Sequence, residues 1–199
     1  MFKKVEYYIV VANNGFTIKN NNDILENIIP FQPYIPNVPF YYHLFDKDKS
    51  YITEITKQFK LLKMKKVTVI LPDDAMNIQV DKQIIFEYLL TCGAKIIKTN
   101  YQCFLLNSIE SNYISISRTI RNFVLQRISN KQSLITKYYY KEHADVGQIL
   151  SDIEKIQSDY GYERIPIFIN NINNDMGRFK NIGDLISIND IFTNIIKYK

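Results

Sequence analysis

Three acidic residues follow predicted strands, at places where carboxylates could act on a phosphate-rich substrate. Asp73 and Asp74 follow the apolar run 67–71 and its closing Pro72, and Asp175 comes shortly after the run 165–169. Open α/β sheets place their ligands at the carboxyl ends of their strands, and carboxylates there can hold Mg²⁺ or act as acid and base. A small metal-dependent phosphoryl-transfer enzyme or nuclease is therefore one hypothesis. Solvated loops are the interpretation that we favour, because adjacent side chains rarely point the same way.

Arg178 follows the same predicted strand as Asp175 and could hold an anion in a bidentate grip, although a solvated loop is again favoured. Ser115 and Ser117, in a predicted hairpin, are further candidate binding residues. They stand with His143 at no spacing typical of a nucleophile and its base, and the sequence contains no G-x-S-x-G or P-loop motif. The sequence therefore indicates neither acyl transfer nor P-loop chemistry.

The cysteines and histidines indicate no disulfide framework and no metal centre. The chain has two of each, Cys92, Cys103, His43 and His143. The histidines are far apart and have no cysteine or acidic cluster at ligand spacing, and both cysteines lie in apolar contexts. We expect buried thiols, and we predict no metal and no cofactor.

The net charge of +5 would favour a nucleic-acid partner if the lysines were concentrated on one element. They are spread along the whole chain instead, which is typical of a solvated surface. The abundance of Lys, Asn, Ile and Tyr is what an AT-rich genome would encode. We therefore expect a protein partner or self-association rather than nucleic acid.

The segment 30–45 combines regularly spaced prolines with aromatic residues. Its prolines are Pro30, Pro33, Pro36 and Pro39. This spacing excludes a helix or a central strand and predicts an extended loop, which loses little entropy on docking. The aromatic residues that we predict to form a partner surface are Phe31, Tyr34, Phe40 and Tyr41. The competing interpretation is that these rings pack against the predicted helix 52–62 of the same chain.

The stretch 65–106 supplies the element around which the rest is organised. Its apolar run 67–71 predicts a strand buried on both faces, and its apolar spacing from Asp81 to Cys92 predicts a helix with one buried stripe. Gly93 can take the left-handed conformation that ends a helix, and the run 94–97 predicts a second strand. Together they predict a right-handed βαβ unit with parallel strands.

The remaining signals complete an α/β fold with a mixed sheet. The run 5–11 and the turn signature Asn13-Asn14-Gly15 predict a hairpin. The further predicted elements are a helix from Ser50, a short helix at 101–107, a hairpin at 113–117 and 122–128 extended by 138–140, a helix from Asp145, a strand at 165–169 and a helix at 191–196. No internal repeat is evident, and the 199 residues, 46% of them hydrophobic, suffice for a single domain spanning 1–199. No apolar run approaches the roughly 20 residues that span a bilayer, so we expect a cytoplasmic protein.

The order of these elements resembles that of the actin-like ATPase superfamily, whose core is ribonuclease-H-like. The closest likeness lies in the strand Val69-Ile70-Leu71-Pro72, the helix 81–92, the turn Cys92-Gly93-Ala94-Lys95 and the strand at 96–97. It covers about forty residues well, and elsewhere it is an order of elements. The resemblance implies two glycine-rich hairpin turns, each with an aspartate, that hold nucleotide phosphates.

The expected phosphate-binding residues are missing from the places that the resemblance indicates. The first hairpin turn reads Ala12-Asn13-Asn14-Gly15-Phe16, with one glycine and no acid. At the second, Ser115, Ser117 and Arg118 stand where an aspartate and glycines are expected, and Asn170-Asn171 replaces a glycine pair. The leading hypothesis is therefore a non-enzymatic scaffold or protein-interaction protein with a degenerate actin-like core.

Overall fold

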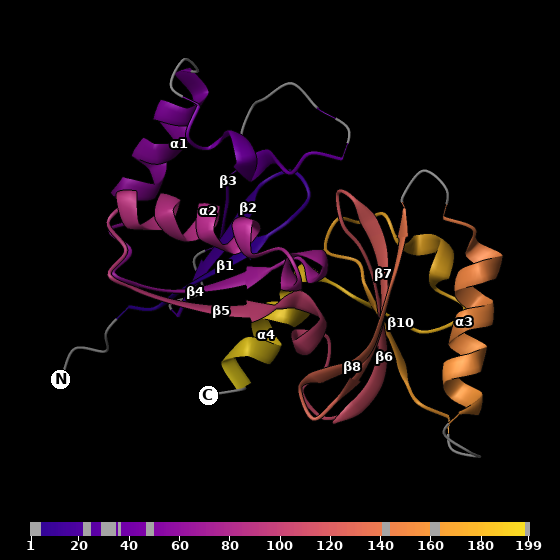
Figure 1. The fold of residues 1–199 in the computed structure, drawn as a ribbon. Helices are drawn as coiled ribbons and strands as arrows, with labels where there is room; N and C mark the ends of the chain where they lie inside the picture. Colours follow the sequence, from indigo (N-terminus) through magenta and orange to yellow (C-terminus); the bar gives the residue numbers. More distant parts are fainter. Residues whose placement is uncertain are drawn as a thin grey trace. The chain divides into compact units, whose positions relative to one another are not determined.

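The computed structural model describes residues 5–21, 25–28, 35, 37–46, 50–140, 144–159 and 164–197. The chain divides into two compact units, Met1–Tyr101 and Gln102–Lys199, and each unit contains a five-stranded sheet (Figure 1). The expected α/β fold is confirmed, with two mixed sheets. A single domain spanning both units stays a prediction. None of the described helices is long and apolar enough to cross a bilayer.

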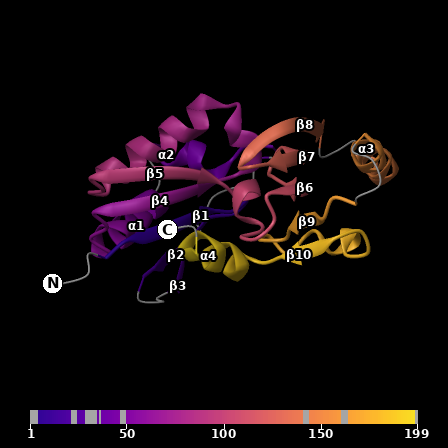
Figure 2. The same ribbon diagram turned by 90° about the horizontal axis from the view of Figure 1, so that it is seen from below.

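Unit 1 has the strand order β3-β2-β1-β4-β5, which Figure 2 shows as a stack. Its strands are β1 (Tyr7–Val11), β2 (Phe16–Asn20), β3 (Leu25–Ile28), β4 (Lys66–Leu71) and β5 (Ile96–Tyr101). Its helices are α1 (Ser50–Leu61) and α2 (Gln79–Thr91), with the 3₁₀ turns η1 (Phe40–His43) and η2 (Asp73–Met76). The first three strands are antiparallel, whereas β1, β4 and β5 are parallel.

The predicted βαβ unit is present as β4, α2 and β5. Helix α2 ends at Gly93, which has a φ of 98°. The amide of Ala94 donates to the carbonyl of Leu89 at 3.0 Å, as in a helix terminated by glycine. In the core of unit 1, both helices pack on one face of the sheet. Phe59 of α1 and Leu89 of α2 belong to the same buried cluster as Val69 of β4. The helix stripe predicted from the sequence is therefore the one that is buried.

Unit 2 has the strand order β10-β9-β6-β7-β8, again stacked in sequence in Figure 2. Its strands are β6 (Asn112–Arg118), β7 (Asn122–Ser129), β8 (Gln132–Tyr140), β9 (Ile167–Asn170) and β10 (Asp184–Ile186). Its helices are α3 (Val146–Ser158) and α4 (Ile188–Lys197), with the 3₁₀ turns η3 (Gln102–Leu105) and η4 (Gly177–Phe179). Strands β6, β7 and β8 are antiparallel, and β6, β9 and β10 are parallel.

Helix α3 covers one face of the unit 2 sheet, as Figure 1 shows. It begins after Asp145, whose carboxylate accepts from the amide of Gly147 at 2.9 Å, so the predicted helix start is confirmed. Its buried residues, Ile149 and Ile153 among them, pack on alternate residues of β6 and β7. Because α3 lies on the face of the sheet, the connecting loops lie at the ends of the strands.

The two units repeat one topology. Each has an antiparallel three-stranded meander, then a helix, then two strands parallel to the first strand of the meander. The sequence shows no corresponding repeat. The short strands β3 and β10 were not predicted, and with them the symmetry of the two sheets was missed.

Candidate functional site

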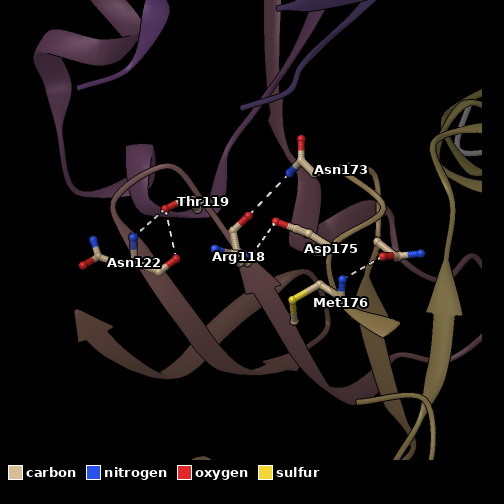
Figure 3. A network of polar contacts seen from close by, with 7 residues as sticks. Arg118, Thr119, Asn122, Asn173, Asp175 and Met176 are labelled. Carbon is tan, nitrogen blue, oxygen red and sulfur yellow. Dashed lines mark hydrogen bonds and ion pairs between the residues drawn. The ribbon is translucent and has the colours of Figure 1, made fainter. Parts of the chain in front are cut away.

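The candidate site lies in unit 2, at the carboxyl ends of β6 and β9. These strands pair in parallel, with Ile114 opposite Ile167 and Ile116 opposite Ile169, so both end at the same edge of the sheet. The turn after β6 and the loop after β9 therefore meet there, as Figure 3 shows. This is where parallel α/β sheets bind ligands.

An ion pair joins the two loops. Arg118 Nη1 lies 3.1 Å from Asp175 Oδ2, and Asn173 Nδ2 donates to the carbonyl of Arg118 at 3.5 Å. The guanidinium groups of Arg118 and Arg178 lie 5.6 and 4.8 Å from the centre of the Phe123 ring. The carboxylate of Asp175, a candidate only under the metal-dependent enzyme hypothesis, thus faces a cation of its own unit.

The turn between β6 and β7 is closed by a threonine hydroxyl. Thr119 Oγ1 accepts from the amide of Asn122 at 3.0 Å, as Figure 3 shows. It also accepts from the amide of Arg121 at 3.3 Å. The amide of Thr119 donates to the carbonyl of Asn122 at 2.8 Å. Successive backbone N–H groups in such a turn can form an anion-binding nest, but here the hydroxyl accepts from two of them.

The loop after β9 is closed in the same way by asparagine side chains. Asn170 Oδ1 accepts from the amide of Ile172 at 3.3 Å, and Asn171 Oδ1 accepts from the amide of Met176 at 3.0 Å. Asn170 Nδ2 also donates to Gln102 Oε1 at 2.8 Å. At the place where the resemblance implies a glycine pair, hydrogen bonds to the asparagine side chains therefore stabilise the loop.

The predicted binding residues of unit 2 do not come together. Ser115 and Ser117 are buried, and their hydroxyls have no hydrogen-bond partner among the described residues. Because side chains alternate along a strand, they point to the face opposite Arg118. Arg178 is exposed and lies over Phe123, which is paired with Arg118, so it is on the other side of the sheet from the two serines.

The acidic pair of unit 1 stands at the corresponding edge of the first sheet. Asp73 and Asp74 form the first turn of η2, after β4 and Pro72. Both are buried, so the favoured interpretation of a solvated loop is wrong for these two residues. Strand β1 runs parallel to β4, so its following turn is at the same edge, where the amide of Ala12 donates to the carbonyl of Gly15 at 2.9 Å. Within the described ranges, no group of three or more His, Cys, Asp or Glu side chains could hold a metal ion.

The aromatic segment is fixed to α2 where the structure describes it. Phe40 and Tyr41 are buried in the core of unit 1, and the hydroxyls of Tyr41 and Tyr42 donate to the two carboxylate oxygens of Asp81 at 2.9 and 2.6 Å. Phe31 and Tyr34 of the predicted partner surface lie outside the described residues. The two described rings are buried within their own unit, as the competing interpretation expects, and they lie on the 3₁₀ turn η1 rather than in an extended loop. The hydrogen bonds join this segment to α2, whereas that interpretation named the helix 52–62.

Asp152 on α3 is a second buried carboxylate, after Asp81, that the sequence did not predict. Asp152 Oδ1 lies 2.9 Å from Lys137 Nζ, and Tyr139 donates to Asp152 Oδ2 at 2.7 Å. The hydrogen bonds from Lys137 and then Tyr139 lower the pKa of Asp152 to about 2, and burial, together with this carboxylate, raises the pKa of Tyr139. Asp81 and Asp152 share a signal in the sequence, an acid on the apolar stripe of a helix, which indicates a buried polar partner.

The arrangement of strands and helices is that of the actin-like ATPase fold. A Bacteroides thetaiotaomicron protein described as having this fold and unknown function is similar over 98% of this chain and 96% of its own, with a TM-score of 0.52 and 10% identity. The ethanolamine utilization protein EutJ from Carboxydothermus hydrogenoformans is similar over 98% of this chain and 88% of its own, with a TM-score of 0.50 and 7% identity. No family model and no curated protein matches the sequence. The predicted resemblance is therefore confirmed for the fold.

Proposed function

We propose that the protein is a non-enzymatic scaffold, a degenerate member of the actin-like fold that binds another protein or a second copy of itself. The observation that carries the proposal is the closed turn after β6, in which Thr119 Oγ1 accepts from the amides of Arg121 and Asn122. A nucleotide phosphate would have to displace this hydroxyl to reach the amides.

The charges at the same edge support the proposal. Holding a nucleotide's Mg²⁺ requires a carboxylate that is available to the metal or its waters. Asp175 Oδ2 is instead paired with Arg118, and Asp175 Oδ1 has no hydrogen-bond partner among the described residues. The guanidinium beside this carboxylate would repel a metal ion. The same pairing weakens the alternative, a metal-dependent phosphoryl-transfer enzyme or nuclease that would use Asp73, Asp74 and Asp175.

The similarity to known structures establishes only the fold, so the proposed function rests on the contacts of Thr119, Arg118 and Asp175. The Bacteroides protein is described as of unknown function, and the Carboxydothermus protein as an ethanolamine utilization protein. At 10% and 7% identity neither description transfers, because one fold supports many activities.

Thermal unfolding with nucleotide tests the proposal. The full chain is melted with and without Mg·ATP and Mg·GTP, and phosphate release is followed in the same samples. We expect an unchanged melting temperature and no turnover. A stabilisation of several degrees, with turnover that Asp73→Asn or Asp74→Asn removes, would instead establish the enzyme.

The proposed partner surface has a separate test in Tyr34→Ser. Tyr41→Ser serves as the comparison, because Tyr41 is buried and its loss should lower the melting temperature. We expect Tyr34→Ser to reduce self-association, measured by sedimentation, without changing the melting temperature. A destabilised Tyr34→Ser monomer would assign this ring to the core and exclude it as an interface.

A further inference from the structure

Unit 1 contains a groove of about 740 Å³ that the proposed site does not use. It lies between α1 and the residues that follow η1. Apolar groups line much of it, among them Leu44, Phe45, Ile52 and Leu61. The volume is within the range of sites that hold small ligands or a few side chains of a partner.

Helix α1 presents two different stripes, and the groove uses the outer one. Its inner stripe, with Ile55 and Phe59, is buried in the core of unit 1. Its outer stripe carries Lys57, Lys60 and Leu61, spaced three and four residues apart, as neighbours on a helix surface are. Leu61 is 69% exposed and Phe45 across the groove is 45% exposed, so both sides offer apolar surface to a partner.

The charge at the groove is positive. Lys57, Lys60 and Lys63 line it, all three are exposed, and the described part of the chain holds no ion-pair partner for them. The lining acid is Asp46, which lies 2.8 Å from His43 Nδ1 and is therefore already engaged. An apolar floor with three exposed ammonium groups is complementary to apolar residues flanked by carboxylates.

We infer that this groove binds an acidic amphipathic helix of a partner protein, an inference that rests on the proposed role in protein binding. Leucine-like side chains of the helix would occupy the space between Phe45 and Leu61, and its carboxylates would face Lys57, Lys60 and Lys63. Helices commonly dock in this way, through apolar anchors spaced three and four residues apart. The concave shape favours a helix over an anionic bilayer, which presents a flat surface.

A labelled peptide provides the probe. It is a short helix with leucines on one stripe and glutamates on both flanks, and it is titrated against the full chain by fluorescence anisotropy. We expect binding that weakens by about tenfold in Lys57→Glu/Lys60→Glu and weakens with added salt, because rim charges act through screened attraction. Leu61→Ser should also weaken binding without unfolding the chain, since Leu61 is largely exposed.

Lys95→Glu/Lys98→Glu is the matched control, because it changes two exposed lysines of unit 1 that do not line the groove. It should bind the peptide as the parent chain does. If the control loses as much peptide binding as Lys57→Glu/Lys60→Glu, or if the parent chain does not bind the peptide, the proposed binding groove is wrong. Binding of vesicles containing phosphatidylglycerol that depends on Lys57 and Lys60, with peptide binding that does not, would overturn it in favour of a membrane surface. Neither result touches the proposed scaffold function, which the nucleotide experiment tests.

Discussion

The two units share a topology but differ in how their last two strands are connected. In unit 1 the 13-residue helix α2 joins β4 to β5, whereas in unit 2 the loop from β9 to β10 contains only the three-residue turn η4. Both connections nevertheless lead to parallel strands. The strand order therefore tolerates the replacement of a covering helix, provided that the shorter loop can pass close to the sheet.

The carboxyl edges of the two sheets differ more than the sheets themselves. Unit 1 has a turn with Gly15 and the buried acids Asp73 and Asp74, whereas unit 2 has the turn closed by Thr119 and the pair of Arg118 with Asp175. One edge is rich in carboxylates, and the other neutralises its own. The same fold thus carries different chemistry at equivalent places, so the activity cannot be inferred from the fold.

One device recurs in both units, a helix carboxylate that holds tyrosine hydroxyls. Asp81 on α2 accepts from Tyr41 and Tyr42, and Asp152 on α3 accepts from Tyr139. Asp152 also has two lysines beside it, Lys137 and Lys155. Protonation of Asp152 should therefore remove an attraction within unit 2.

The largest expected effect is at Gly183, in the short connection of unit 2. A Cβ there would overlap the carbonyl oxygen of Ile167, so Gly183→Ala must displace backbone. We expect a loss of about 3 kcal/mol in the free energy of unfolding, measured with urea. Gly177→Ala is the control, because a Cβ at Gly177 meets nothing within 4 Å.

The same variant tests whether the two units form one domain. Hydrogen exchange of Gly183→Ala is followed at amides of β4 and of β9. Because the chain length predicts a single domain, we expect protection to fall in both strands. Faster exchange confined to β9 would show that the units unfold independently and would contradict that prediction.

The next effect concerns Asp81. Asp81→Ala removes the acceptor of two tyrosine hydroxyls, and Tyr41 and Asp81 are buried, so we expect a loss of about 2 kcal/mol. Glu87→Ala is the matched control, since it removes an exposed acid from the same helix. If both variants are equally stable, the hydrogen bonds of the aromatic segment to Asp81 do not contribute to the free energy of unfolding of unit 1.

The βαβ unit could be predicted because its signals are local. A buried strand, a helix stripe and the glycine that ends the helix lie in order within about forty residues, and Gly93 adopts the left-handed conformation that the sequence indicated. The start of α3 at Asp145 was predicted for the same reason, because a helix cap involves only neighbouring residues.

The contacts of the candidate site, and those that hold the aromatic segment of unit 1, could not be predicted because they are distant in sequence. Arg118 and Asp175 are 57 residues apart, and Tyr41 and Asp81 are 40 apart. Strands β3 and β10 have four and three residues, too few for an alternating pattern to be recognised. Strand alternation also places Ser115 and Ser117 on the face opposite Arg118, although the resemblance had grouped the three residues at one site.

The smallest expected effect is the acid response of Asp152. Its folded-state pKa of about 2 lies below the ordinary value of 3.8, so it adds stability above pH 4 that is lost as the pH falls from about 4 toward 2. Asp152→Asn keeps an oxygen for Tyr139 but loses the attraction to Lys137, which is partly exposed and therefore screened. We expect a loss of about 1 kcal/mol at pH 7 and none near pH 2, measured by urea unfolding across this range. Asp145→Asn is the control, because it changes an exposed cap of the same helix. If the parent chain and Asp152→Asn lose stability in parallel down to pH 2, the lysines beside Asp152 add no stability to unit 2.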